Sequence, residues 1–484
     1  GIISSVLVYN FLKSLNIETD IYIPDRTDEG YDLGIDFIKK VSGSIDLIIS
    51  VDCGTNNTRS QGYIRDNQDG PDVIACDHHN PTLKDYPDND KYIIINPKMP
   101  GSKYPFKNLS GGGVTFKFLI AVLRSLDSKQ KNIFNKDYLG SLLDLVAVST
   151  IADVMPLIDE NRILVKKGLE KIQNTSNTGL KALIDIAVPD GGIIGEYDIG
   201  FNIAPRLNAA GRVGTAIDSF KLLSDDDTDN IYIANCLDSF NRERRDIQKK
   251  ILDEILLQYD FNEIISQKRI FIAKSNDWNE GVLGIVASGI VKKFNLPAIL
   301  FRERNGILKG SGRSIPQFDL HGNLMQLEDL FIKFGGHKLA CGISMDPQNF
   351  SEFYEKMSAI ANRRISSEEL VKKYEYDIEI GFQDIDIRFL EDLCLLRPNG
   401  LGNPRPAFIT RDCDVIEVKQ LKNGKHAKIR LKNNNRIFDG LIFNIDDSKK
   451  KILSDKKKID ILYDLQLNTW NNIVSIQIII KDIF

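Results

Sequence analysis

The chain has 484 residues, of which 42% are hydrophobic, so it is long enough for roughly two to four domains with separate cores. Its formal charge of −4 argues against a general coat for polyanions, although a local basic groove is compatible with it. The sequence contains no apolar run of about eighteen residues, no stretch typical of a signal peptide and no CxxC spacing among its cysteines. We therefore expect a cytoplasmic protein with reduced thiols, without a membrane span, a disulfide framework or a zinc knuckle.

The first part of the chain, to about residue 155, alternates helical patterns with short β-rich runs. This alternation predicts an α/β domain with a doubly wound parallel sheet. Ligands collect at the carboxyl ends of the strands in such sheets. Asp52 follows the run LIISV and Asp77 follows VIAC, so both are expected at one rim of the sheet. The predicted strands are IETDIYIP (17–24), SIDLIISVDCG (44–54), PDVIACDHH (71–79) and KYIIINP (91–97), followed by an apolar helix at 142–157.

The rest of the chain divides into three further regions. Residues from about 160 to 260 are mainly helical and highly charged, which predicts a long connector, with NRERR (241–245) as a solvated face. A second α/β region follows, with RIFIAKS (269–275), AILFRE (298–303), ILKGSGRS (307–314) and the glycine-rich FGGHKLACGIS (334–344). The last 115 or so residues contain five short β runs, a pattern that suits a small barrel such as an OB-fold.

A set of possible metal ligands ends several apolar runs of the first region. Carboxylate oxygens combined with imidazole nitrogens suit Mn²⁺ or Mg²⁺ better than a structural zinc. For a DHH triplet alone, the commoner interpretation is that Asp77 caps a helix and the histidines belong to a loop. The other aspartates favour the metal site, whose candidates are Asp52, Asp77, His78, His79 and Asp153.

Several blocks of the sequence resemble a known family. SVDCGT (50–55), ACDHHNP (75–81) and STIADVMPL (149–157) resemble the second, third and fourth motifs of the DHH phosphoesterases, and FGGHKLACGIS resembles the signature of the DHHA1 domain. Four more blocks narrow the resemblance to the RecJ family of single-stranded-DNA-specific exonucleases. They are FNIAPRLNAAGRV (201–213), WNEGVLGIVASGI (278–290), LKGSGRSIPQFDLHGNL (308–324) and RPNGLGNPRPAF (397–408).

The resemblance implies a domain order and an activity. The domains would be a DHH catalytic domain (1–160), a helical connector (161–262), a DHHA1 substrate-binding domain (263–362) and an OB-fold nucleic-acid-binding domain (363–484). The activity would be 5′ to 3′ hydrolysis of single-stranded DNA to 5′-mononucleotides in recombination and repair, with two Mn²⁺ or Mg²⁺ ions per site. Partners would be single-stranded DNA, a RecQ-type helicase and a single-stranded-DNA-binding protein, and no membrane.

The resemblance also assigns residues. Asp52, His78 and Asp153 would be catalytic metal ligands, and His79 a catalytic ligand or the partner of one. Arg26, Ser311, Arg313 and His337 would contact substrate, since guanidinium groups and glycine-flanked backbone suit phosphate. By themselves, GSGR and GGH are more often glycine turns. Arg206, Asn208 and Arg212 either line the cleft or lock the connector, and the barrel offers Lys425, His426, Lys428, Arg430 and Trp470 for single strands, with Trp470 equally suited to the core.

Two departures from the family pattern stand out. The family's first motif, an HxDxDG-type segment with metal-binding aspartates, would end at Gly1, so we expect an N-terminally truncated chain with impaired activity rather than a degenerate relative. Asn279 stands where the family usually has histidine. The alternatives are a nano-RNase or cyclic-dinucleotide phosphodiesterase of the same superfamily, which the 397–408 block and barrel disfavour, and a catalytically silent replication scaffold, which the clustered ligands disfavour.

Overall fold

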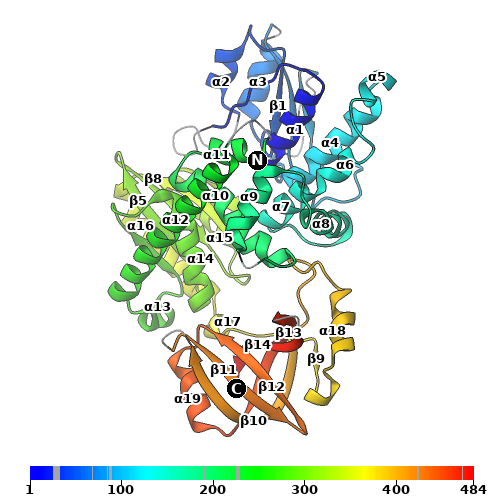
Figure 1. Cartoon of the computed structure of the whole chain (residues 1–484). Coiled ribbons are helices and arrows are strands. Elements are labelled where there is room, and N and C mark those ends of the chain that lie inside the picture. The colour runs from blue at the N-terminus through cyan, green and yellow to red at the C-terminus, as the bar shows by residue number, and fades with distance from the viewer. Residues whose placement is uncertain are drawn as a thin grey trace.

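Two α/β lobes and a β-barrel follow one another along the chain (Figure 1). The computed structural model describes residues 1–24, 33–67, 69–83, 86, 90–189, 191–224, 229–421, 424–470 and 473–484, and the side chains of 468–470 and 473–474 lie outside the description. In the described residues, no helix is long and apolar enough to span a bilayer. The α/β class with a C-terminal barrel confirms the predicted fold.

The first lobe is built on a short parallel sheet in the order β1-β2-β3, made of β1 (Leu47–Val51), β2 (Asp72–Cys76) and β3 (Tyr92–Ile95). Its apolar residues alternate between two cores, as expected for a sheet covered on both faces. Ile48 packs in a small core with α2 (Ile35–Val41) and α3 (Thr58–Asp66), whereas Ile49 packs on the opposite side. That second core also holds α1 (Ile2–Ser14), α4 (Gly111–Ser125) and α7 (Leu143–Ala152).

The strand predicted at 17–24 is wrong, because these residues form an irregular segment. Ile21 and Ile23 pack against the first-lobe core, so their alternation with polar residues reflects burial on one side. Their backbone pairs with no strand in the described part of the chain, and without such pairing an alternating pattern does not make a sheet.

A helical connector joins the two lobes, as predicted. The 29-residue α12 is about 43 Å long. It carries Leu237 into the first core and Ile251 into the second. The solvated face predicted for 241–245 is wrong for Asn241 and Arg244, which are buried because they share the inward stripe of the helix. The connector helices are α8 (Asp159–Ile172), α9 (Thr178–Ala187), the π-helix η1 (Asp198–Ile203), α10 (Ala204–Val213), α11 (Ile217–Leu223), α12 (Asn230–Gln258) and α13 (Phe261–Gln267).

The second lobe has a mixed five-stranded sheet in the order β4-β5-β6-β8-β7. Only β4 and β5 pair in parallel, and the β7–β8 hairpin contains the glycine-rich block. The strands are β4 (Phe271–Lys274), β5 (Ala298–Arg304), β6 (Ile307–Arg313), β7 (Phe331–His337) and β8 (Ala340–Met345), and the main helices are α14 (Leu283–Phe294), α15 (Leu320–Leu324) and α16 (Phe350–Arg364).

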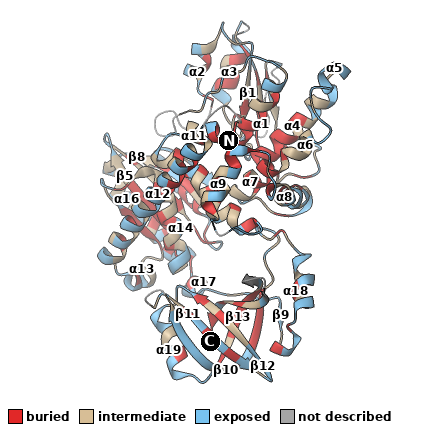
Figure 2. Ribbon diagram, in the orientation of Figure 1, coloured by how far each residue is buried: buried red, intermediate tan, exposed pale blue. Residues whose placement is uncertain are grey.

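The barrel closes because β11 pairs with both β10 and β12, and its interior is buried (Figure 2). A short parallel strand, β9 (Ile378–Glu379), extends the sheet beside β10, and α18 (Ile387–Cys394) stands beside the barrel (Figure 1). The barrel elements are β10 (Phe408–Leu421), β11 (His426–Asn433), β12 (Arg436–Phe443), α19 (Asp447–Asp455), β13 (Lys458–Trp470) and β14 (Ile473–Ile483). The helix between the third and fourth barrel strands completes the predicted OB architecture.

Candidate metal centre and the facing cleft

His78 lies between two carboxylates at the rim of the first sheet. Its Nδ1 is 3.0 Å from the carbonyl oxygen of Leu109, which can only accept, so Nδ1 carries the proton. In the neutral ring, Nε2 is then an unprotonated lone pair. This atom lies 3.1 Å from Asp52 Oδ1 and 3.3 Å from Asp153 Oδ2. Three acceptor atoms therefore converge, which is the arrangement of ligands around a cation.

The surrounding elements fix these three side chains. Asp52 follows β1 in a left-handed conformation (φ 61°), and its N–H donates to the Cys76 carbonyl at the end of β2. Asp153 is the residue at which α7 ends, and its N–H donates to the Ser149 carbonyl. His78 follows β2 and is buried. Neighbouring parallel strands and a helix end thus bring together residues that are 26 to 101 positions apart (78 minus 52, and 153 minus 52).

Asp77 organises the histidine pair. Its Oδ1 accepts from the backbone N–H groups of His78 and His79 and lies 2.7 Å from His79 Nδ1, while its Oδ2 accepts from the Thr55 N–H. The Asp77 contact fixes the ring of His79 and leaves its Nε2 available. Asp52, His78 and His79 each offer one ligand atom within 4.8 Å of the others. The interpretation of Asp77 as a helix cap is wrong, because no helix follows it before α4 in the described residues.

Helix α4 approaches Asp52 closely because it begins with three glycines. A Cβ at Gly111 would lie 2.1 Å from Asp52 Oδ1, so only glycine allows this approach. Ser110 caps the helix, its Oγ accepting from the Gly113 N–H. The N-terminal end of a helix carries partial positive charge, which stabilises the nearby carboxylate.

The charges of the cluster shift one another. Burial would raise the pKa of Asp52, and a protonated His78 beside it would lower the pKa. Burial would likewise raise the pKa of Asp77, yet the hydrogen bonds from His79 and Thr55 lower it. Burial raises the pKa of Asp153, and the negative charge of Asp52 raises it further. A positive charge on His78 would lower this pKa only in part.

Ser311, Arg313 and His337 lie on one face of the second sheet. Arg313 pairs with Ala340, and Ala340 pairs with His337, in adjacent antiparallel ladders. Directly opposed residues point to the same face, so the Arg313 and His337 side chains share it. Ser311 lies one row away on that face and is opposed by Gly342 and then Gly335.

This face is open beside Ser311 and faces the metal cluster. A Cβ at Gly342 or Gly335 would meet no atom within 4 Å. Burial lowers the pKa of His337, and the charges of His79 and Lys98 in the first lobe lower it further. The charges of His79 and Lys98 act on His337, so this end of the second sheet lies near the first-lobe rim. We infer that the glycine-lined face forms the wall opposite the metal cluster.

A DHH family N-terminal domain model matches residues 1–150, a DHHA1 domain model matches 267–363 and a RecJ OB domain model matches 376–482. The Salmonella typhimurium single-stranded-DNA-specific exonuclease RecJ is 31% identical over all of this chain, which covers 85% of that protein. This chain belongs to the RecJ family. The Bacillus subtilis RecJ is 34% identical over the whole chain, but the chain spans only 59% of its length.

Solved RecJ-family structures share the fold. RecJ from Thermus thermophilus in complex with Mn²⁺ superposes with a TM-score of 0.82 at 27% identity, covering all of this chain and 67% of that one. An exonuclease RecJ bound to manganese gives a TM-score of 0.61 at 30% identity, covering 76% of this chain and 91% of that one.

The other residues that the sequence indicated as possible contacts fall into two groups. Some have a structural role, and to the others the structure assigns no role. Arg206 joins two helices within the connector rather than locking the connector to the first domain, because its guanidinium, on α10, pairs with buried Asp238 on α12. Arg212 Nη1 donates to the Gly281 carbonyl and so joins the connector to the second lobe. Asn208 is exposed, and Asn279, at the family's usual histidine position, caps a turn by accepting from the Gly281 N–H. Arg26 lies outside the described residues.

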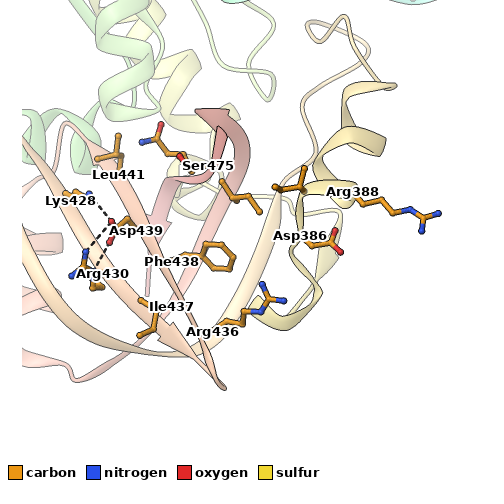
Figure 3. Close-up of a pocket in the computed structure, with 13 residues that line it drawn as sticks. Asp386, Arg388, Lys428, Arg430, Arg436, Ile437, Phe438, Asp439, Leu441 and Ser475 are labelled. Atoms are coloured by element: carbon orange, nitrogen blue, oxygen red, sulfur yellow. Dashed lines mark hydrogen bonds and ion pairs between the residues drawn. The ribbon is translucent and has the colours of Figure 1, made fainter. Parts of the chain in front are cut away.

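The barrel carries a groove of about 980 Å³ between α18 and strands β11, β12 and β14 (Figure 3). Two of the basic residues predicted for strand binding, Lys428 and Arg430, line it but are both paired with Asp439, at 2.9 and 3.0 Å. Arg388 and Arg436 also line the groove, and neither forms an ion pair within the described chain. Sequence reasoning missed both arginines. Arg388 lies on α18, before the barrel strands in the sequence, and Arg436 begins the predicted run RIFDGLIF but was not singled out.

Two residues of the first-lobe site, Gly111 and Lys98, were also missed as functional candidates. Asp77 was a candidate of the metal site, but its role of holding the two histidines was not predicted. Gly111 is the first glycine of the SGGG run (110–113), which ends a loop and opens a helix, a pattern typical of close backbone approach. Lys98 is recognisable only in the structure, where burial lowers its pKa while the Asp153 and Asp77 charges raise it.

Proposed function

We propose that this chain carries out metal-dependent 5′ to 3′ hydrolysis of single-stranded DNA, releasing 5′-mononucleotides. The observation that supports this most directly is His78 Nε2, which faces two carboxylates across from a wall that is open enough for a nucleic acid backbone. Family membership agrees with it, since RecJ-family relatives are named single-stranded-DNA-specific exonucleases.

The residues of the rim fit a divalent ion. Asp52 Oδ1 is buried and accepts no hydrogen bond from the described residues, although His78 Nε2 is close by. Two facing acceptors repel unless a cation lies near both. Asp52, His78 and Asp153 would therefore hold Mn²⁺ or Mg²⁺, with His79 as a further ligand or as a partner of one, and the family pattern adds a second ion. Bound ions supply an activated water and stabilise charge on the phosphoryl group.

The protein side chains would orient the substrate around this centre. Leu109 and Asp77 hold the two histidine rings, so the ligand atoms need no rearrangement. On the opposite wall, Arg313 and Ser311, with Arg26, would bind the 5′ phosphate, because a guanidinium group forms paired hydrogen bonds with phosphate oxygens. His337 would donate a hydrogen bond near the scissile phosphate. A wall of glycines admits one strand without reading its bases.

The domain assignment follows from this path. Residues 1–160 would supply catalysis, 161–262 the connector, 263–362 the substrate wall and 363–484 a nucleic-acid-binding barrel whose groove takes the strand beyond the cleft. Arg436, whose side chain lies between β12 and α18 in Figure 3, is the groove cation that we propose for phosphate contact. We further propose a role in recombination and repair in the cytoplasm, together with a RecQ-type helicase and a single-stranded-DNA-binding protein.

Two alternative functions are disfavoured. The barrel argues against the smaller phosphodiesterases of the superfamily, and the ligand cluster argues against a catalytically silent scaffold.

The test is Mn²⁺-dependent release of mononucleotides from 5′-labelled single-stranded DNA, with duplex DNA and single-stranded RNA as comparisons. The assay uses this chain and a version extended upstream by the first family motif. We expect activity on single-stranded DNA that is lost in Asp153→Ala and kept in Asp185→Ala, which removes an exposed aspartate of α9. DNA binding without hydrolysis in both versions would instead support the scaffold.

A further inference from the structure

The block RPNGLGN, residues 397–403, lies between α18 and β10 in the sequence but contacts the first lobe. We call these residues the 397–403 turn. In Figure 1 the segment after α18 leaves the barrel and rises to the lobe above it, below α8. Barrel packing does not explain the turn, because its main contacts are with the residues that follow Asp153.

The turn supports the segment 154–158 by a backbone hydrogen bond and close packing. The Leu157 N–H donates to the Leu401 carbonyl at 2.7 Å. A Cβ at Gly400 would lie 2.8 Å from Leu157 Cδ1. Gly402 has a φ of +76°, and a Cβ there would lie 3.3 Å from both Pro156 and Ile158. Both glycines are therefore required by close approach, and one of them also by its conformation.

A buried carboxylate fastens the turn to the connector. Glu196 is 9% exposed and accepts from Arg397 through both of its oxygens, at 3.2 and 2.6 Å, and from the Asn399 N–H at 2.8 Å. On the other side, the Arg162 guanidinium of α8 donates to the Leu396 carbonyl at 2.8 Å. Paired guanidinium–carboxylate hydrogen bonds fix orientation as well as distance, so the turn is held in one position.

Further contacts connect the turn to two of the metal-ligand candidates, Asp153 and His78. Asp153 ends α7, and the next residue, Val154, has a left-handed φ of 52°. The N–H groups of Val154 and Met155 still donate to carbonyls of α7, and beyond Met155 the backbone leaves the helix and is held by the turn through Leu157. Buried Asn161 ties this segment to the rim, because its Nδ2 donates to the Pro156 and Asn108 carbonyls at 3.0 and 2.6 Å. The residue after Asn108 is Leu109, whose carbonyl holds His78.

We propose that the 397–403 turn is a positioning element for the metal centre, holding Asp153 at the distance from His78 that a shared ion requires. Its metal part rests on the proposed function. Ligand geometry must be held within a fraction of an ångström for tight binding, and residues that orient ligands typically change metal affinity by about 10- to 100-fold. Correct packing of the barrel against the first lobe would therefore be required for a well-formed metal site, because the turn belongs to the segment that joins the two.

The test combines two variants with matched controls. Gly400→Ala forces Leu157 away, and its control Gly34→Ala adds the same methyl group where no atom lies within 4 Å. Glu196→Gln removes the charge that holds Arg397, and its control Glu379→Gln removes the partner of Arg411 in the barrel. The measurements are hydrogen–deuterium exchange of peptide 153–158 and the Kd for Mn²⁺ by calorimetry, each at a temperature where all variants are folded.

We expect faster exchange in 153–158 and a Kd for Mn²⁺ raised about tenfold in both variants, with both controls unchanged. The double variant Gly400→Ala with Leu157→Val removes the colliding carbon and should restore much of the affinity. Unchanged exchange, or faster exchange with unchanged Mn²⁺ affinity, would overturn the proposal. If the unmodified chain binds no Mn²⁺, the proposed metal centre fails, and the exchange data still decide whether the turn holds the Asp153 segment.

Discussion

The two walls of the cleft are built in opposite ways. On the first lobe, the polar atoms of Asp77, His78 and His79 hold one another through hydrogen bonds, and the carboxylates of Asp52 and Asp153 converge on His78. On the second lobe, the corresponding face is nearly bare, with open space above Gly335 and Gly342. One wall is preorganised around fixed atoms, and the other offers room.

This difference separates two tasks. Charge stabilisation needs donors and ligands that do not rearrange during the reaction, and the hydrogen bonds of the first wall provide that. A strand that must advance after each cleavage needs contacts that are few and independent of the base, and glycine backbone provides those. Substitutions on the first wall should therefore change metal affinity or stability, and substitutions on the second wall should change strand binding alone.

Removing the central ligand should have the largest effect. In His78→Ala, the two carboxylates keep their positions but lose the nitrogen between them, so we expect the Kd for Mn²⁺ to rise by more than about 100-fold. Calorimetry on the DNA-free protein measures this directly. His426→Ala removes a barrel histidine and serves as control; equal losses in both variants would mean that the cluster is not the metal site.

Asp77→Asn should destabilise the first-lobe wall of the cleft. The carboxylate accepts four donors, and an amide can accept only through its oxygen, so we expect a loss of about 2 kcal/mol in the free energy of unfolding near pH 7. The pKa of Asp77 is lowered in the folded state, so its stabilisation is present above the ordinary value of 3.8 and is lost as the pH falls towards the folded pKa.

Urea unfolding between about pH 3 and pH 6 should show this acid-side loss in the unmodified protein and a flatter profile in Asp77→Asn. The matched control is Asp72→Asn, which changes an exposed aspartate at the start of β2. Identical profiles in the unmodified protein and Asp77→Asn would show that the hydrogen bonds of Asp77 do not stabilise the fold.

On the bare wall, Gly342→Val should weaken strand binding and spare the metal. The new side chain occupies the space beside Ser311, so we expect the KM for single-stranded DNA to rise about tenfold, equivalent to about 1.4 kcal/mol, with unchanged Mn²⁺ affinity. Ser344→Val adds a similar side chain one row further from His337 and should change KM less. A change in Mn²⁺ affinity for Gly342→Val would remove the distinction between the two walls.

The smallest effect is expected in the barrel groove. Asp439→Asn removes the ion-pair partner that Lys428 and Arg430 share and leaves Arg430 its contact with Glu417. Exposed pairs contribute only about 0.5 kcal/mol, so single-stranded DNA should bind about two- to threefold more tightly. Fluorescence anisotropy with a labelled oligonucleotide measures the change. Asp482→Asn, which breaks the Lys449 pair elsewhere in the barrel, should leave the affinity unchanged; equal gains would indicate a general charge effect.

Local pattern predicted most of the architecture. Each barrel strand expected from its β-rich run is present, as are the three parallel strands that end before Asp52, Asp77 and Asn96. The failures share one cause. The alternation at 17–24 and the charge run at 241–245 were judged by composition, whereas pairing and burial depend on what other segments place beside them.

For the candidate site, residue types and spacing indicated Asp52, His78 and Asp153, and the structure places them around one nitrogen. Their role as ligands stays a prediction, as do the substrate roles of Arg26, Ser311, Arg313 and His337. The sequence drew attention to Asp77 and Gly111 but not to the residues that they contact. Asp77 accepts a hydrogen bond from Thr55, 22 residues away (77 minus 55), and Gly111 approaches Asp52, 59 residues away (111 minus 52). Both contacts depend on how the chain packs.

The sequence by itself determined the order of elements, the ends of the strands and the chemical types of the ligands, because these depend on local periodicity and on each side chain's own chemistry. The tertiary structure alone decided that His78 is held by Leu109, that Lys428 and Arg430 both pair with Asp439, and that the 397–403 turn reaches the segment after Asp153. Such contacts join residues far apart in the chain, and their geometry is set by the packing of whole domains rather than by any local preference.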